Sequence, residues 1–241
     1  MSESVGYVGK DLEAMSFAVN YHRWILASFA PHLGTRMVEV GAGTGSFSAL
    51  LVERRPQSLS LVEPSPSMFA QLSEHAQERF SAVDLQLYNE TFDRVAAQIR
   101  VRQQPDSIVY VNVLEHTADD ESEIRVIAET LGPGGRVFIF VPALSWLYGS
   151  FDREINHYRR YSRSELESKC RAAGFRILVS RYFDLFGVLP WWLKYRLLQS
   201  RKMEPGAVRL YDQAVVPLAK RLEAIAAPPL GKNILLVAEK L

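Results

Sequence analysis

Three glycines at alternate positions follow directly after a short apolar run, 37–40. They are Gly41, Gly43 and Gly45, and an apolar helix-like segment comes next. Glycine lets a chain turn sharply after a strand and leaves room for a ligand against the backbone. A dinucleotide fingerprint would need a glycine at position 46, where the chain has Ser46, and a P-loop would need Gly-Lys-Ser/Thr. The turn therefore predicts a ligand-binding site that is neither a dinucleotide site nor a P-loop.

An acidic residue, Glu39, stands two positions before the first glycine. A carboxylate at the mouth of such a turn repels a pyrophosphate and attracts an ammonium group, because the interaction energy follows the sign of the charges. The turn is thus predicted to bind a cofactor that has a cationic end and no phosphates.

Apolar runs of strand length alternate with helical patterns along the rest of the chain. Predicted strands lie at 37–40, 59–63, 85–88, 107–114, 136–141, 175–182 and 233–240. Predicted helices lie at 11–30, 47–53, 66–80, 119–131 and 162–173. This alternation predicts an α/β fold with a doubly wound, mostly parallel, Rossmann-like sheet of about seven strands. We expect a single domain over 1–241, with a cap helix within 1–35 and a helical insert at 185–230 between the last two strands.

Composition limits the partners and the compartment. The 28 basic and 27 acidic residues nearly cancel, so we expect no nucleic-acid partner. The single cysteine, Cys170, excludes a disulfide framework and a Cys-rich zinc site, and no metal ligand set is predicted. The first residues lack the layout of a signal peptide, and the longest uncharged run, 137–151, is too short to span a bilayer. We expect a cytoplasmic protein, monomeric or homodimeric.

Five motifs in order resemble those of the class I S-adenosylmethionine-dependent methyltransferases, and they run along most of the chain. The first motif is the glycine turn from Glu39 to Gly45, including Ala42. The second is Glu63-Pro64 at the end of a predicted strand, where the family has an acidic residue that binds both ribose hydroxyls. The resemblance implies S-adenosylmethionine as the cofactor, held in part by these residues.

The remaining motifs follow the later strands. Asn89-Glu90-Thr91 stands where the family contacts adenine, so Glu90 is expected to accept a hydrogen bond from the adenine amino group. Asn112-Val113-Leu-Glu-His116 resembles an Asp-x-Leu-Glu-His motif, with Asn112 replacing the aspartate near the methionine end. The fifth motif is the turn Gly132-Pro-Gly-Gly135.

The N-terminal helix carries a further resemblance. Tyr21 and Trp24 lie in a segment similar to the Asn-Tyr-x-Arg-Trp sequence of part of the family, in which this helix covers the cofactor. An amphipathic helix that packs these two rings into the core explains the same pattern equally well.

Two histidines are candidates for the acceptor side. A base is needed when the methyl acceptor arrives protonated. His116 follows the fourth predicted strand, and His157 begins a His-Tyr-Arg-Arg-Tyr segment that resembles a signature on the substrate side of a bacterial branch of the family. Tyr158 and Arg159 would then contact the substrate. The guanidinium groups of Arg159 and Arg160 suit a carboxylate or phosphate of the substrate, or else the two arginines pair with Asp152 or Glu154.

The insert at 185–230 leaves three interpretations open. Trp191 and Trp192 suggest a lid over an apolar or aromatic substrate. The same tryptophans, with nearby lysines and arginines, resemble a helix that lies at a membrane surface. A dimer surface is the third possibility.

The resemblance predicts methyl transfer from S-adenosylmethionine to an oxygen or nitrogen of a small molecule, in a biosynthetic pathway. The alternatives are a partner subunit that binds the cofactor without turnover and a methyltransferase acting on a lipid at a membrane surface. A nucleic-acid methyltransferase is disfavoured, because Asn112-Val113-Leu-Glu stands where those enzymes have Asn/Asp-Pro-Pro-aromatic.

Overall fold

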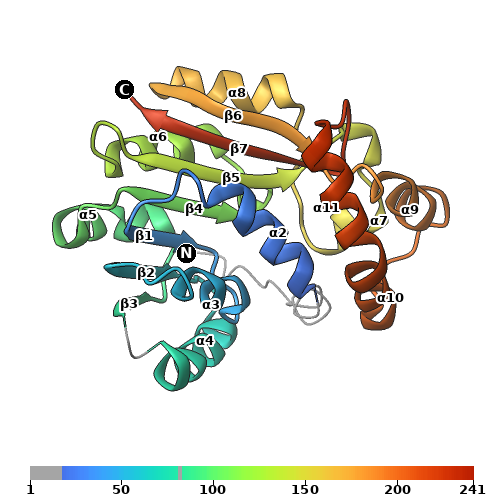
Figure 1. Ribbon diagram of the computed structural model, residues 1–241. Helices are drawn as coiled ribbons and strands as arrows, with labels where there is room; N and C mark the ends of the chain where they lie inside the picture. The colour runs from blue at the N-terminus through green and yellow to red at the C-terminus, as the bar shows by residue number, and fades with distance from the viewer. Residues whose placement is uncertain (1–17, 81–82) are drawn as a thin grey trace.

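A seven-stranded sheet in the order β3-β2-β1-β4-β5-β7-β6 forms the centre of the molecule (Figure 1). The computed structural model describes residues 18–80 and 83–241. The strands are β1 (Arg36–Val40), β2 (Ser58–Val62), β3 (Asp84–Tyr88), β4 (Ser107–Val111), β5 (Arg136–Pro142), β6 (Phe175–Phe183) and β7 (Asn233–Lys240). The predicted doubly wound α/β fold is confirmed.

Strand direction divides the sheet into two parts. The first five strands pair in parallel, whereas β7 is antiparallel to both β5 and β6. Helices cover both faces, so central strands are buried on both sides and consist of nearly continuous apolar residues. Neighbouring side chains on β4 show this, because Ile108 packs in the core on one face and Val109 in the core on the other.

The helices form one layer on each face of the sheet. One layer holds α2 (Val19–Phe29), α3 (Ser46–Val52), α4 (Pro66–Arg79) and α11 (Val216–Ile225). The opposite layer holds α5 (Phe92–Gln103), α6 (Asp120–Thr130) and α8 (Arg163–Ala172). The short α7 (Ser150–Glu154) lies in the loop after β5. Ser162 and Glu165 form a capping box at the start of α8, whose span agrees with the helix predicted at 162–173.

Three local predictions differ from the structure. Strand β4 ends at Val111 and not at 114, because Asn112 adopts a left-handed φ of 54° and a 3-10 turn follows at Leu114–His116. Helix α5 was not predicted, although its buried residues Phe92, Val95, Ala96 and Ile99 recur at helical spacing. The helix predicted at 11–30 is observed from Val19, and its first residues lie outside the described ones.

The insert between β6 and β7 is helical, as predicted. It contains α9 (Val188–Trp191), a π-helical segment (Trp192–Leu197), α10 (Pro205–Leu210), a second π-helical segment (Tyr211–Val215) and α11. Asp212 accepts hydrogen bonds from the backbone N–H groups of Asn20 and Tyr21, 3.1 and 2.8 Å away. These bonds satisfy otherwise unpaired donors at the beginning of α2 and join the insert to that helix.

Candidate functional site

A cavity of about 1060 Å³ opens at the carboxyl ends of the parallel strands. Its walls come from the glycine turn after β1, the ends of β2 and β4, the start of α5 and the loop around α7. Open α/β sheets bind ligands at this edge, and the volume suits a cofactor together with a second small molecule.

One end of the cavity is organised by the carboxylate of Glu63. Its two oxygens accept hydrogen bonds from the backbone N–H groups of Gly43 and Ser65, each 2.8 Å long. Burial raises the pKa of Glu63 even though both N–H donors act in the opposite direction. The bonds fix the carboxylate at the cavity wall, in a position to accept further hydrogen bonds from a ligand.

Gly41 allows the turn to pack closely against the segment after β4. Its φ is 71°, and a Cβ at this position would lie only 2.4 Å from Cγ2 of Val113. Any larger residue would therefore push apart two walls of the cavity.

Glu39 lies deeper at the same end and is almost completely buried. The hydroxyl of Ser48 donates to its carboxylate at 2.5 Å. Burial raises the pKa of Glu39 to about 8, the Ser48 hydrogen bond lowering it only in part. A ligand cation at this point would favour the ionised form, which fits the cationic end predicted for the cofactor.

Most of the residues predicted to bind the cofactor meet in this cavity. The wall includes Glu39, Gly41, Ala42, Gly43, Glu63, Pro64, Thr91, Asn112 and Val113. Gly45 does not line it and instead begins α3 with a φ of 89°. Glu90 does not line it either, because its side chain is exposed and forms an ion pair with Arg94 at 3.4 Å.

Helix α2 turns its predicted cofactor residues away from the cavity. Tyr21 and Trp24 are buried beside Phe183, and the Tyr21 hydroxyl bonds with Asp184 and Asn233. Residues three apart share a helix face whereas adjacent residues are about 100° apart, so His22 faces the cavity instead. Burial lowers the pKa of His22 to about 4. Tyr21 and Trp24 thus pack in the core, as the second of the two interpretations of this helix predicts.

The opposite end of the cavity is built around His157. Its Nδ1 lies 3.0 Å from Oδ1 of Asp152, and the same oxygen accepts a hydrogen bond from Nε of Arg160 at 2.8 Å. Burial disfavours ionisation of Asp152, but the His157 hydrogen bond and the Arg160 charge outweigh it and hold its pKa below the usual range. Because an ionised carboxylate only accepts hydrogen bonds, the proton of neutral His157 belongs on Nδ1 and Nε2 carries the lone pair.

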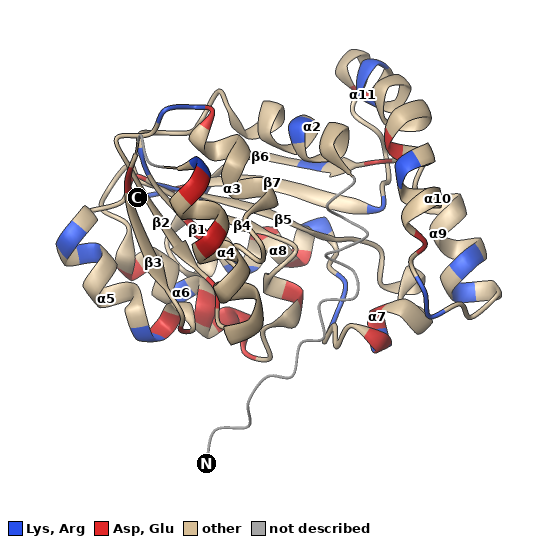
Figure 2. Cartoon of the chain, turned by 90° about the horizontal axis from the view of Figure 1, so that it is seen from below, with Lys and Arg blue, Asp and Glu red and all other residues tan. Residues whose placement is uncertain are grey.

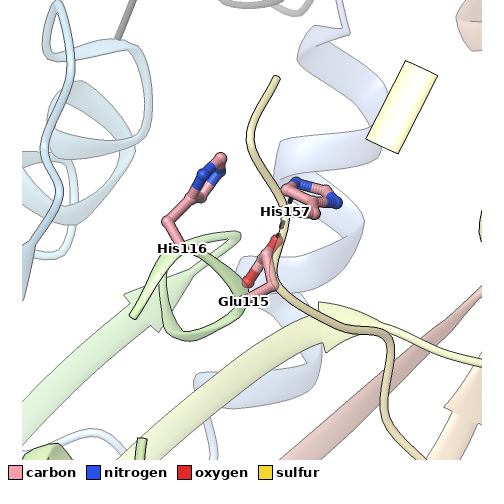
Figure 3. Close-up of side chains that lie close together, drawn as sticks. All are labelled: Glu115, His116 and His157. Atoms are coloured by element: carbon pink, nitrogen blue, oxygen red, sulfur yellow. Dashed lines mark ion pairs between the residues drawn. The ribbon is translucent and has the colours of Figure 1, made fainter. Parts of the chain in front are cut away.

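Glu115 and His116 complete this end from the turn after β4 (Figure 3). Nε2 of His157 lies 3.8 Å from Oε1 of the fully buried Glu115, and the two imidazole rings are 4.6 Å apart. Burial raises the pKa of Glu115 to about 7 and lowers that of His116 to about 3, so His116 is neutral at physiological pH. Ligand atoms of Glu115, His116 and His157 lie within 4.8 Å of one another, and among the described residues these are the ones able to hold a metal ion.

Not all of the predicted substrate residues lie at this end. Tyr158 lines the cavity beside His157. Arg159 does not; it forms an ion pair with Asp120 at 2.8 Å, an acid that was not among the predicted partners, whereas Arg160 pairs with Asp152 as the structural alternative predicts. Neither Trp191 nor Trp192 lines it, and within 185–230, all of which is described, no other residue does. The insert therefore contributes no residue to the wall of this cavity.

Several cavity residues were not predicted. Asp93 lines the wall from the first turn of α5, close to the place expected for Glu90. An acidic residue in the first turn of a helix could have marked Asp93, but helix α5 itself was not predicted. Tyr148, Arg153 and Asn156 come from the loop around α7, where no pattern of spacing marked them.

Comparison with known sequences supports the resemblance. A sequence family described as a methyltransferase domain matches residues 17–180. A ubiquinone biosynthesis O-methyltransferase from Ralstonia nicotianae is 28% identical over 167 residues, 63% of this chain and 66% of that protein. The enzyme of the same name from Aeromonas salmonicida is 32% identical over 117 residues, 48% of this chain and 47% of that protein. The matches thus span about half to two thirds of these relatives.

Comparison with solved structures concerns the fold. A SAM-dependent methyltransferase from Archaeoglobus fulgidus has a TM-score of 0.62 and 16% identity, and the match covers 95% of this chain and 99% of that one. At this identity the similarity shows a shared sheet and helix arrangement.

Proposed function

This chain belongs to the class I S-adenosylmethionine-dependent methyltransferases, and from that premise we propose that it methylates an oxygen or nitrogen of a small molecule, with His157 accepting the proton. The observation that carries the proposal is the division of the cavity. Buried carboxylates line one end, and a histidine oriented by Asp152 lines the other. An oxygen acceptor is favoured, because the relatives matched in sequence are named O-methyltransferases.

The carboxylate end fits the cofactor. Glu63 would accept from the ribose hydroxyls, and Glu39 would offset the positive charge of the methionine portion. Gly41 and Gly43 have no side chains, so a ligand can lie directly against the backbone there. Bound S-adenosylmethionine supplies an electrophilic methyl group on a sulfonium.

The histidine end handles the acceptor and its proton. Asp152 holds His157 with its Nε2 lone pair available, and the protonated imidazole that results is stabilised by that same carboxylate. Glu115, 3.8 Å from Nε2, favours the charged form further when it is ionised. His116 stays neutral beside them and offers a polar wall to the acceptor. Much of the rate in such a displacement comes from positioning.

Two other functions fit the same cofactor end. A partner subunit that binds the cofactor without turnover would keep Glu39 and Glu63 but would gain nothing from the His157–Asp152 pair. A methyltransferase acting on a lipid at a membrane surface would use the same chemistry on a different acceptor. The ordered histidine favours an active enzyme.

The test is transfer of radiolabelled methyl from S-adenosylmethionine to a panel of phenols, catechols and amines, some carrying a prenyl tail. We expect at least one acceptor to be methylated by the wild type and much more slowly by His157→Ala. Cofactor binding with no transfer to any acceptor would favour the partner subunit, and no binding at all would contradict the proposal.

A further inference from the structure

The helical insert carries a concentration of exposed apolar side chains. Most large apolar residues exposed in the described part of the chain belong to 185–230. In the first half of the insert, Leu189, Leu193 and Leu197 are 67, 44 and 56% exposed. On α11, Leu218, Leu222 and Ile225 are 53, 44 and 84% exposed. Exposed apolar groups gathered on one element indicate an interaction surface, whereas scattered ones do not.

The spacing of these residues places them in stripes. Leu189, Leu193 and Leu197 recur every four residues, and Leu218, Leu222 and Ile225 are four and three residues apart. Residues at such spacing lie on one side of a helix. The opposite sides face the protein, where Tyr195 packs with Phe151, and Val216 and Ala219 join the core. Both the segment 189–197 and α11 therefore present an apolar stripe outward.

Positive charge accompanies the stripes (Figure 2). Exposed bases in the insert are Arg196, Arg201, Lys202, Arg209, Lys220 and Arg221. Of the acidic residues in 185–230, Asp212 and Glu223 are buried, and only Glu204 is exposed. Apolar stripes flanked by bases are the composition of helices that lie in the interface of an anionic bilayer. A second copy of the chain would bring the same positive charges face to face, which opposes association.

We propose that the insert at 185–230 docks the protein on an anionic membrane surface, with the stripes in the lipid interface and the bases at the headgroups. No described helix is long and apolar enough to cross a membrane, so the contact is peripheral. Docking does not depend on methyl transfer and would hold even if the proposed function failed.

The surface is connected to the active site through α7. The Ser150 hydroxyl donates to the Tyr195 carbonyl at 3.0 Å, and the guanidinium of Arg160 lies 4.6 Å above the Trp191 ring. Arg160 also holds Asp152, the partner of His157. Docking therefore brings the acceptor end of the cavity into connection with the membrane-facing segment.

The test is co-sedimentation of the full chain with vesicles of phosphatidylcholine alone and with about 30% phosphatidylglycerol. We expect the wild type to bind the anionic vesicles at least about tenfold more tightly than the neutral ones, and less tightly at high salt. Leu189→Ser/Leu193→Ser/Leu197→Ser and Arg196→Glu/Arg221→Glu should each reduce binding about tenfold or more.

The matched control removes similar groups from a distant helix. Val101, with Arg100 and Arg102, is exposed on α5, so Val101→Ser/Arg100→Glu/Arg102→Glu should bind vesicles like the wild type. Circular dichroism shows whether each variant is folded without relying on cofactor binding. Failure of the wild type to sediment with anionic vesicles, or an equal loss in the control, would overturn the proposal. A dimer in sedimentation velocity that the leucine variant abolishes would assign the surface to a second copy instead.

Discussion

The two ends of the cavity are built in different ways. At the cofactor end, backbone N–H groups from the turns after β1 and β2 hold a carboxylate, as Gly43 and Ser65 hold Glu63. At the acceptor end, side chains of the loop after β5 hold one another, as Asp152 holds both His157 and Arg160. A backbone site depends on local conformation, whereas a side-chain network depends on every member being present. Mutations should therefore affect the two ends differently.

The largest effect is expected at the acceptor end. His157→Ala should lower the rate of methyl transfer about 10²–10⁴-fold, the usual contribution of a general base, and leave the affinity for S-adenosylhomocysteine unchanged. Steady-state kinetics and calorimetry measure the two quantities. His32→Ala is the control, since His32 is partly exposed and lies outside the cavity walls. A variant with normal kcat would remove His157 from the proposed role.

The network at this end should also support stability. Asp152→Ala leaves the buried Arg160 guanidinium without its partner, which is expected to cost about 3–5 kcal/mol of unfolding free energy. Denaturant unfolding measures it. Asp84→Ala, at an exposed carboxylate on β3, should change stability by less than about 0.5 kcal/mol. Equal costs for the two variants would mean that the network contributes nothing beyond a surface charge.

At the cofactor end a single pair of variants sharpens the contrast. Glu63→Ala should weaken binding of S-adenosylhomocysteine by about 1–3 kcal/mol, because it removes charge-assisted hydrogen bonds to the ribose. Glu90→Ala should have no effect, since that side chain is exposed and paired with Arg94. Calorimetric titration compares them directly. A loss at Glu90 as large as at Glu63 would contradict the position of Glu90 outside the cavity wall.

The smallest expected effect is a dependence of cofactor binding on pH. Burial raises the pKa of Glu39 to about 8, so this group is protonated at pH 7 in the empty site. A bound ammonium group lowers that pKa, and binding therefore releases up to about one proton and tightens by about 1 kcal/mol per pH unit as pH rises from 6 to 8. Calorimetry in buffers of different ionisation enthalpy detects the proton.

Glu39→Gln is the control for this measurement, because it cannot release a proton. Proton release that is the same in this variant and the wild type would assign the titration to another group.

Local patterns were sufficient for the sheet and for most of the cofactor end. Strand β7 and the wall from Glu39 to Gly43 follow directly from apolar runs and glycine spacing. The orientation of helix α2 was harder to predict. Tyr21 and Trp24 share one face of the helix, but the sequence pattern does not show whether that face points to the core or to the cavity. At the acceptor end, the sequence marked His116 and His157 but not the residues that hold His157. Its partners lie in another loop or five residues away, and only tertiary packing shows that Glu115 is buried beside it.

The five-residue helix α7 separates two environments. One side of its loop presents His157 to the cavity, and the other side packs Phe151 against Trp191 and Tyr195 of the insert. The glycine turn takes no part in that packing. Substitutions around Trp191 and Tyr195 can therefore shift the acceptor end during evolution and leave the glycine turn intact. We expect chains with this architecture to diversify in what they methylate while keeping the same methyl donor.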